Sequence, residues 1–266
     1  MTTLLTIVIV AAGTYAFLAF FAHCIADSVI FRPHESSYRD GGRITKIVAD
    51  DGTPLTAIHL PVPKAVATVL YLHGNAEDIG DIIPHLEEMQ RRGLAVVAFD
   101  YRGYGTTPGS PTERNVNADT RTVFRHLVEN LGVASDEVLL YGRSLGSGPA
   151  IELATRETVC GLVLDGAFTS TYRVVTQISL LPGDRFRNID RITRVKCPIL
   201  FIHGTLDLVT PAFHGKSLYD LVRGPKRSLW VEGAGHSDVV EVAGEAYWQA
   251  IMEIARGLQP SPMPRP

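Results

Sequence analysis

The stretch Gly142-Arg143-Ser144-Leu145-Gly146 decides the fold of this chain, because it fits the pattern G-x-S-x-G and stands between two predicted elements. Residues 137–141 are largely apolar and predict a strand, and residues 147–156 predict a helix. In that context the serine lies on a strained turn at the carboxyl end of a strand, where flanking glycines let the backbone close up. A glycine-rich turn of an ordinary parallel sheet is the alternative, but the predicted neighbours favour Ser144 as a nucleophile.

A serine nucleophile needs a histidine to take its proton and an acid to orient that histidine. In this arrangement both follow the serine, the acid first, each at the carboxyl end of a later strand. The apolar run 199–202 leads into Asp207, and the predicted strand 228–231 leads into His236. Because the carboxyl ends of parallel strands meet at one edge of a sheet, Ser144, Asp207 and His236 are predicted to form a catalytic triad.

Other roles remain open for the acid and the histidine. Asp207 could cap the following helix, and His236 could be an ordinary surface histidine. Asp165, at the end of the predicted strand 162–164, competes with Asp207 as the acid. Asp238 is a weaker competitor, since it lies only two residues past His236 and cannot easily turn back onto the same ring.

Acyl transfer also needs two N–H groups that stabilise the negative oxygen of the tetrahedral intermediate, the oxyanion. The backbone N–H of Leu145, directly after the serine, is expected to be one of them. The other is expected in the loop that follows the predicted strand 68–72, where Asn75 is favoured over Ala76. His73, in the same loop, is interpreted as a residue that fixes the loop.

Strands and helices alternate along most of the chain, which is typical of a mainly parallel sheet with helices on both faces. An antiparallel hairpin of residues 43–49 and 56–60, joined around Asp51-Gly52-Thr53, is expected to precede the alternation. The predicted strands are 68–72, 95–99, 138–141, 162–164, 199–202 and 228–231, and the predicted helices are 79–92, 116–130, 147–156, 213–221 and 239–256.

The motifs together resemble the α/β-hydrolase superfamily over residues 42–257. Within it, residues 111–115 and 229–236 are most similar to small, nearly lidless serine hydrolases that include protein depalmitoylases and their membrane-anchored bacterial and fungal relatives. The resemblance implies a serine hydrolase that cleaves esters or thioesters. Those depalmitoylases carry a lipidated, cysteine-rich amino terminus, whereas this chain has Cys24 alone in that region.

Composition agrees with a single enzyme domain. The chain has 266 residues, a net charge of −3 and 20% charged residues, so it shows no sign of a nucleic-acid partner. Its three cysteines, Cys24, Cys160 and Cys197, form no disulfide framework, and the last two each precede an apolar strand. No group of residues has metal-ligand spacing, and the proposed chemistry needs no cofactor.

The amino-terminal segment predicts a membrane anchor. Residues 4–22 contain no charged side chain, and about 20 apolar residues suffice to cross the hydrocarbon core as a helix. A cleaved signal peptide is the alternative, but it favours a basic start and a shorter apolar run. Arg32, Arg39, Arg43 and Lys46 follow the segment and no basic residue precedes it, which favours a catalytic domain on the cytoplasmic face. Cys24 could be palmitoylated near the interface.

Three smaller features complete the organisation. Residues 168–194 are long enough for a short lid, whose apolar residues could line a shallow acyl groove or simply cover the sheet edge. Asp100 and Arg102 are expected to pair and fix their loop, and Arg143 could meet the entering substrate. The expected organisation is an anchor at 1–31, a catalytic domain at 32–258 and a proline-rich tail at 259–266.

The sequence therefore predicts a membrane-anchored serine hydrolase acting on small or lipid acyl esters or thioesters. A serine aminopeptidase is the runner-up, although no acidic cluster that would bind a substrate ammonium group is evident in the sequence. A membrane-tethered interaction module with an inactive hydrolase fold is the alternative outside the enzymes. Since residues 1–31 contain no motif residue, the domain without them is expected to be soluble and active.

Overall fold

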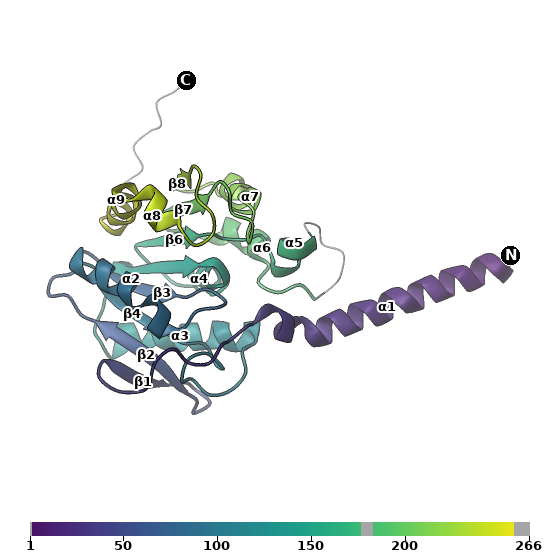
Figure 1. Ribbon diagram of the computed structural model, residues 1–266, viewed down its shortest axis with the longest axis horizontal. Coiled ribbons are helices and arrows are strands. Elements are labelled where there is room, and N and C mark those ends of the chain that lie inside the picture. Colours follow the sequence, from purple (N-terminus) through teal and green to yellow (C-terminus); the bar gives the residue numbers. More distant parts are fainter. Residues whose placement is uncertain (1, 177–182, 258–266) are drawn as a thin grey trace, which may run out of the picture.

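The computed structural model describes residues 2–176 and 183–257, and it shows one long helix leading into an α/β domain (Figure 1). Eight strands form a single sheet in the order β1-β2-β4-β3-β5-β6-β7-β8. The strands are β1 (Ile44–Val48), β2 (Pro54–Leu60), β3 (Thr68–Leu72), β4 (Ala95–Phe99), β5 (Val138–Arg143), β6 (Gly161–Asp165), β7 (Ile199–Gly204) and β8 (Lys226–Val231). Strands β3 to β8 are all parallel, whereas β1 and β2 pair antiparallel. The predicted mainly parallel sheet and its amino-terminal hairpin are therefore confirmed.

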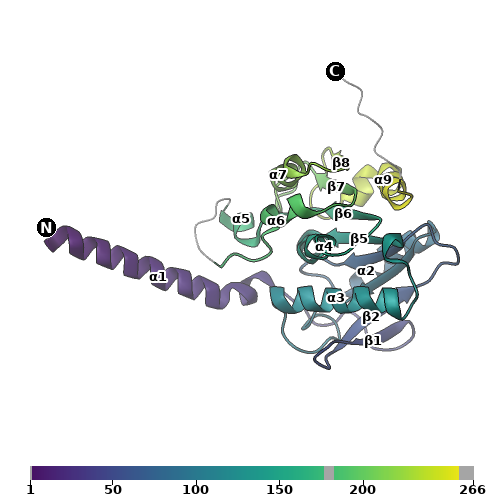
Figure 2. The same ribbon diagram turned by 180° about the vertical axis from the view of Figure 1, so that it is seen from behind.

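Helices cover both faces of the sheet (Figures 1 and 2). One face packs against α2 (Ile79–Arg91), α8 (Val239–Ala243) and α9 (Glu245–Ala255). The other packs against α3 (Glu113–Glu129), α4 (Ser147–Ala154) and α7 (Phe213–Leu221), and two short helices, α5 (Thr171–Thr176) and α6 (Asn188–Arg191), lie in the connection between β6 and β7. Three 3₁₀ turns, η1 (Ser135–Glu137), η2 (Ser144–Gly146) and η3 (Ile192–Arg194), complete the fold.

The central strands are buried on both faces, which explains their continuous apolar runs. In β3 the side chains alternate: Leu70 and Leu72 join the core under α3 and α4, whereas Val69 and Tyr71 join the core under α2 and α9. Each buried CH₂ group contributes about 0.8 kcal/mol to folding, so burial on both faces stabilises the central strands. The carboxyl ends of these parallel strands lie at one edge of the sheet.

The last predicted helix differs from the sequence expectation. Residues 239–256 were expected to form one helix, but the structure breaks it into α8 and α9 at Gly244. Gly244 has a φ of 55°, in the left-handed region that interrupts a right-handed helix. After this break, the amino-terminal end of α9, with Tyr247 and Trp248, lies beside the carboxyl edge of the sheet.

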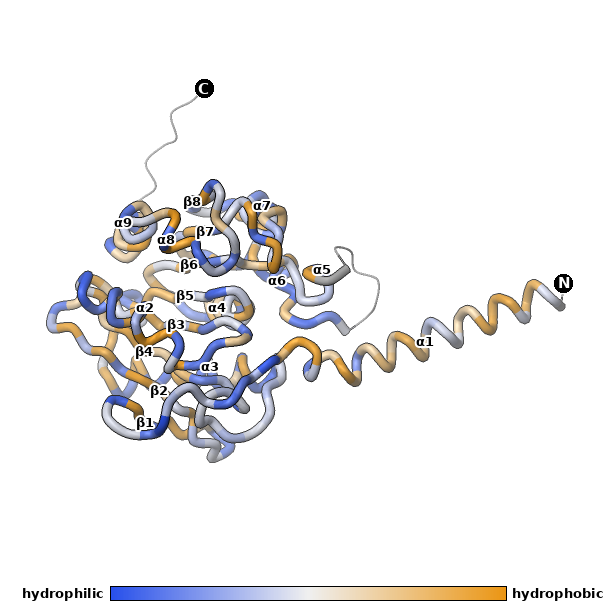
Figure 3. The backbone as a smooth tube through the Cα atoms, viewed as in Figure 1, coloured by the Kyte–Doolittle hydropathy of each residue, from blue (hydrophilic) through white to orange (hydrophobic). Residues whose placement is uncertain are grey.

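Helix α1 (Thr2–Ile30) projects from the domain as a long rod (Figures 1 and 2). Its residues Thr3–Ile30 include an 18-residue stretch with a mean hydropathy of 2.3 and, among the described residues, form the one helix long and apolar enough to cross a membrane. Apolar residues run along most of the rod (Figure 3). Its carboxyl-terminal end contacts the described part of the domain, where Ala26 is buried.

Candidate active site

Ser144 lies on a strained turn between β5 and α4. Its φ of 48° falls in the left-handed region, which is unusual for a residue other than glycine. A Cβ atom added at Gly142 would lie 2.7 Å from the carbonyl oxygen of Gly146, and one added at Gly146 would overlap the carbonyl of Leu72. The two glycines are therefore required for the tight turn that exposes the Ser144 hydroxyl at the carboxyl edge of the sheet.

The structure brings Ser144, His236 and Asp207 together. His236 Nε2 lies 3.0 Å from Ser144 Oγ, and His236 Nδ1 lies 2.6 Å from Asp207 Oδ2. With the Nδ1 proton donated to the carboxylate, Nε2 is free to accept the serine proton. Asp207 follows β7 and His236 follows β8, neighbouring strands that end at the same edge as β5.

Asp207 is held as an ionised acceptor. Its side chain is buried, and its Oδ1 accepts hydrogen bonds from the backbone N–H groups of Val209 and Thr210, at 2.9 and 2.7 Å. Burial opposes ionisation, but the hydrogen bonds from His203 and His236 outweigh it and lower the pKa of Asp207. The carboxylate is thus negative at neutral pH and can stabilise a protonated His236.

His203 is a residue of this site that the sequence analysis did not single out. Its Nε2 donates to the carbonyl of Thr210 at 2.7 Å and lies 3.4 Å from Asp207 Oδ2. The His203 ring is buried beneath the loop that carries Asp207. Its position at the end of β7, four residues before Asp207, is the signal that could have indicated a positioning role.

The two competing acids lie elsewhere. Asp165 accepts hydrogen bonds from the hydroxyl groups of Tyr141 and Tyr247, at 2.7 and 3.4 Å. Asp238 accepts the backbone N–H of Gly235 at 2.6 Å and so closes the loop before His236. Among the described residues, the carboxylate bonded to the His236 ring is that of Asp207.

The two residues expected to donate to the oxyanion lie on neighbouring parts of the fold. Leu145 follows Ser144 in η2, and Asn75 lies in the loop after β3, the strand that pairs with β5 at Leu72 and Gly142. Arg143, a possible contact for the entering substrate, makes an ion pair with Glu77 and lines the cavity beside His236. Glu77 also accepts the backbone N–H of Gly74 at 2.8 Å, so this pair supports the loop that carries Asn75.

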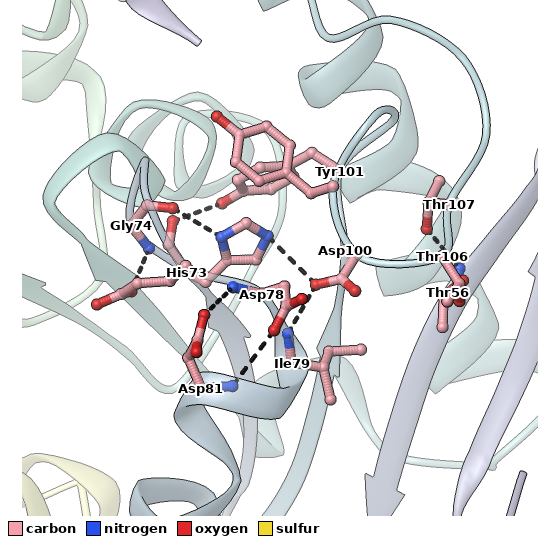
Figure 4. Close-up of polar contacts among 12 residues, drawn as sticks. Thr56, His73, Gly74, Asp78, Ile79, Asp81, Asp100, Tyr101, Thr106 and Thr107 are labelled. Carbon is pink, nitrogen blue, oxygen red and sulfur yellow. Dashed lines mark hydrogen bonds and ion pairs between the residues drawn. The ribbon is translucent and has the colours of Figure 1, made fainter. Parts of the chain in front are cut away.

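His73 anchors that loop from within the core (Figure 4). Its Nδ1 donates to the carbonyl of Gly74 at 2.7 Å, and its Nε2 lies 3.6 Å from Asp100. Tyr101 donates from its hydroxyl to the His73 carbonyl at 3.0 Å. Burial lowers the pKa of His73 to about 4 and raises that of Asp100 to about 7. His73 is accordingly neutral at pH 7 and has the loop-fixing position expected for it.

The expected pair of Asp100 and Arg102 does not form. Asp100 accepts from the Tyr38 hydroxyl and from the backbone N–H of Ile79, the latter at 2.9 Å. Arg102 turns to the opposite side and bonds to Asp119 and Asp51, at 2.7 and 2.6 Å. Positions i and i+2 share a side only within a strand, and Arg102 lies in a turn after the end of β4, so its side chain does not follow that of Asp100.

A cavity of about 430 Å³ opens beside His236. Its walls come from α2, α8 and α9 and include Ile82, Val240, Tyr247 and Trp248, with His236 at one side. The cavity also has five carboxylate side chains, from Glu77, Asp81, Glu88, Asp165 and Glu241. The sequence analysis did not identify this group, because Asp165 and Glu241 join Glu77, Asp81 and Glu88 only when distant segments fold together.

One further group has potential metal ligands. His34, Asp78 and Asp81 offer ligand atoms within 4.8 Å of one another. Asp78 and Asp81 form the capping box of α2, and His34 Nε2 bonds to Asp81 at 2.9 Å. Since the cap of α2 already uses these carboxylates, the group is explained without a metal.

A serine on a strained strand-to-helix turn, in a mainly parallel sheet with this topology, defines the class of α/β hydrolases. The family model for serine aminopeptidase, S33, matches residues 63–182. The α/β-hydrolase domain-containing protein aho-3 of Caenorhabditis elegans is 38% identical over 205 residues, which are 74% of this chain and 60% of that protein. Human α/β-hydrolase domain-containing protein 17B is 37% identical over 66% of this chain and 62% of its own length. The chain belongs to this α/β-hydrolase domain-containing group and spans about three fifths of these relatives.

Solved structures share the fold at low sequence identity. An esterase from Pyrococcus furiosus superposes with a TM-score of 0.71 at 18% identity, covering 86% of this chain and 99% of the esterase. A puromycin-hydrolysing peptidase from Mycobacterium tuberculosis has a TM-score of 0.64 at 17% identity, covering 81% of this chain and 38% of the peptidase. Both show that the α/β-hydrolase fold extends over most of the chain.

Proposed function

We propose that this protein is a serine hydrolase that cleaves carboxylic esters or acyl thioesters. The observation that carries the proposal is the continuous hydrogen-bonded chain from Ser144 through His236 to the ionised Asp207. Such a chain activates a serine hydroxyl, and Ser144 lies on the turn that presents it at the carboxyl edge of the sheet.

The proposed reaction has two halves. His236 accepts the proton of Ser144 as the serine oxygen attacks the carbonyl carbon, while the backbone N–H groups of Leu145 and Asn75 stabilise the oxyanion. His236 then protonates the leaving alcohol or thiol, which departs and leaves an acyl-enzyme. Water repeats the sequence and releases the acid. Asp207 holds the His236 tautomer and stabilises its protonated form in both halves.

The cavity beside His236 supports a place for the leaving group. A general acid must lie next to the atom that it protonates, and His236 lines this cavity. Aromatic and aliphatic walls, such as Trp248, Tyr247 and Ile82, suit an uncharged organic group. The acyl part of the substrate is then directed away from this cavity.

An aminopeptidase is less well supported, although the matching family model is named after one. Four of the five cavity carboxylates already bond within the protein: Glu77 to Arg143, Asp81 to His34, Glu88 to Arg92, and Asp165 to two tyrosines. An ammonium group would have to compete with these bonds. An inactive interaction module would not need the strained Ser144 turn, because strain persists at sites where it serves a function.

Activity on p-nitrophenyl esters should depend on acyl length. Each buried CH₂ group contributes about 0.8 kcal/mol, close to a fourfold rise in kcat/KM, until the acyl groove ends. Among the described lid residues, Phe168 and Phe186 are buried in the core, whereas Ile178, Leu180 and Leu181 lie outside the described residues. We therefore expect kcat/KM to rise from acetate to butyrate or octanoate and then to fall.

The length series is measured with monomeric esters below their micelle concentration, after fluorophosphonate labelling has counted the active sites. Long acyl groups are expected to react well only when they are presented from a bilayer. A steady rise to palmitate in free solution would instead demonstrate a deep acyl tunnel and contradict the shallow groove.

We propose that α1 anchors the protein in a membrane, with the catalytic domain on the cytoplasmic face. Its 29 residues make a helix of about 43 Å, longer than the hydrocarbon core of about 30 Å. Arg32 and Arg39, after the helix, support the cytoplasmic orientation.

The anchor predicts that the full-length protein stays in the membrane pellet after a carbonate wash and enters solution only with detergent. The uncharged apolar stretch of residues 4–22 gains too much free energy from the hydrocarbon core to leave it in high pH buffer. Mass spectrometry of the amino terminus gives the control, because a first residue beyond Ala22 would demonstrate a cleaved signal. Release into the carbonate supernatant would also contradict the anchor.

A further inference from the structure

The carboxyl-terminal end of α1 is bonded to the loop that carries the proposed oxyanion donor. Asn75 Nδ2 donates to the carbonyl of Ile30 at 2.5 Å, and Asn75 Oδ1 accepts the backbone N–H of Arg32 at 3.0 Å. The Tyr104 hydroxyl donates to the same Asn75 oxygen at 2.7 Å and accepts the Arg32 N–H at 3.1 Å. The last carbonyls of a helix lack intrahelical partners, so the Asn75 amide serves as the cap of α1.

Apolar packing joins the same end of α1 to the serine turn. Phe31 is only 4% exposed, and its ring lies 6.0 Å from that of Phe186 in an edge-on arrangement. Phe186 is fully buried against Gly148 of α4, where an added Cβ atom would overlap its ring. Helix α4 begins directly after the serine turn, so Phe31 belongs to the core that supports Ser144.

The connection between β6 and β7 contacts α1 as well. Arg185 Nε donates to Asp27 Oδ1 at 3.1 Å, and the hydroxyl of Tyr172 donates to the carbonyl of Ala22 at 3.4 Å. Asp27 is the one acidic residue of α1, and its charge is matched by Arg185. Two segments that border the site, the Asn75 loop and the lid region, therefore both bind the end of α1.

The length of α1 agrees with a division into two parts. A membrane span needs about 20 residues, and α1 has 29. Residues 3–18 are exposed, whereas the contacts with the domain named above come from residues 22–32. The amino-terminal part of α1 is thus available to cross the bilayer. The remaining carboxyl-terminal part is the part that packs against the catalytic domain.

The geometry points to the docked end of α1, residues 22–32, as a positioning element of the active site that holds the Asn75 loop in place for oxyanion binding. The inference rests on the proposed function and deepens it: Ile30, Arg32 and Tyr104 act through Asn75, whose backbone N–H meets the substrate. It also refines the expectation from sequence that a chain without residues 1–31 is active, because that deletion removes the Ile30 carbonyl and Phe31 and should lower kcat.

The test uses the full-length protein in detergent and the variant Asn75→Leu, which keeps the backbone N–H but loses both side-chain bonds to α1. Since loss of one oxyanion donor costs about 10²–10³ in kcat, a misplaced donor is expected to cost about 10–100-fold. KM should change by less than about threefold, because the effect arises in the transition state. The affinity for a trifluoromethyl ketone, whose adduct carries the oxyanion, should fall by the same factor as kcat/KM.

Asn115→Leu is the matched control, since the Asn115 side chain donates to the backbone carbonyl of Ser110 and, among the described residues, makes no hydrogen bond to α1. It should keep wild-type kcat. Tyr104→Phe removes the hydroxyl that bonds to the Asn75 side chain and to the Arg32 N–H. It is expected to lower kcat in the same way but by a smaller factor. This second variant provides the test if Asn75→Leu does not fold. Thermal unfolding of each variant separates loss of fold from loss of positioning.

The inference is overturned if folded Asn75→Leu and Tyr104→Phe both retain wild-type kcat and ketone affinity while Ser144→Ala is inactive. In that case the proposed function stands and α1 is only a tether. If the wild-type protein neither labels with fluorophosphonate nor hydrolyses esters, the proposed function fails first and the inference fails with it. A parallel fall of kcat and ketone affinity in both variants supports the inference.

Discussion

Ser144→Ala is expected to yield a folded protein that does not label with fluorophosphonate and that loses about 10⁶-fold in kcat on short esters, in line with other serine triads. The change removes the attacking oxygen and nothing else that the fold uses. Ser144 Oγ bonds to His236 Nε2, and loss of one hydrogen bond costs only about 1 kcal/mol of stability. Active-site labelling and thermal unfolding of the same sample measure both parts.

Residual turnover of about 10³-fold over water would agree with this expectation, because the oxyanion donors and substrate binding remain. Ser147→Ala is a suitable control, since Ser147 lies on the first turn of α4 and makes no hydrogen bond from its side chain to the described residues. Full labelling of Ser144→Ala would exclude Ser144 as the nucleophile.

Asp207→Asn is expected to lower kcat by about 10⁴-fold with little change in fold. The asparagine oxygen can still accept the backbone N–H groups of Val209 and Thr210, so the loop keeps its shape. The asparagine NH₂ group, however, donates toward His236 Nδ1 and favours the tautomer whose Nε2 already carries a proton. His236 can then no longer accept the proton of Ser144.

Asp165→Asn is the comparison that separates the two acids. Its amide oxygen can still accept from the Tyr141 hydroxyl, and the carboxylate bonded to the His236 ring among the described residues is that of Asp207, so kcat should fall far less than in Asp207→Asn. Steady-state kinetics on one short ester, with sites counted by labelling, compares the two variants. If Asp165→Asn were the more damaged enzyme, the acid of the triad would have to be reassigned.

Much of the fold could be predicted because its signals are local. Apolar runs placed the strands within a few residues, and the G-x-S-x-G pattern placed the turn between β5 and α4. Parallel strands end at one edge, so the order Ser144, Asp207, His236 along the chain was enough to predict that they meet. The break at Gly244 was missed, because one glycine within a helical pattern is often tolerated.

What the sequence by itself determined was therefore the order of the elements, the direction of the sheet and the edge where the candidate triad residues meet, since these follow from periodicity and motif spacing. Only the tertiary structure decided which side chains from distant segments bond to the residues around the site. Asn75 meets Arg32 across 43 residues of chain, Arg185 meets Asp27 across 158, and Asp100 bonds to Tyr38 rather than to Arg102. Such contacts depend on how distant segments pack, and no local pattern encodes the distance between two side chains before the sheet and its covering helices are assembled.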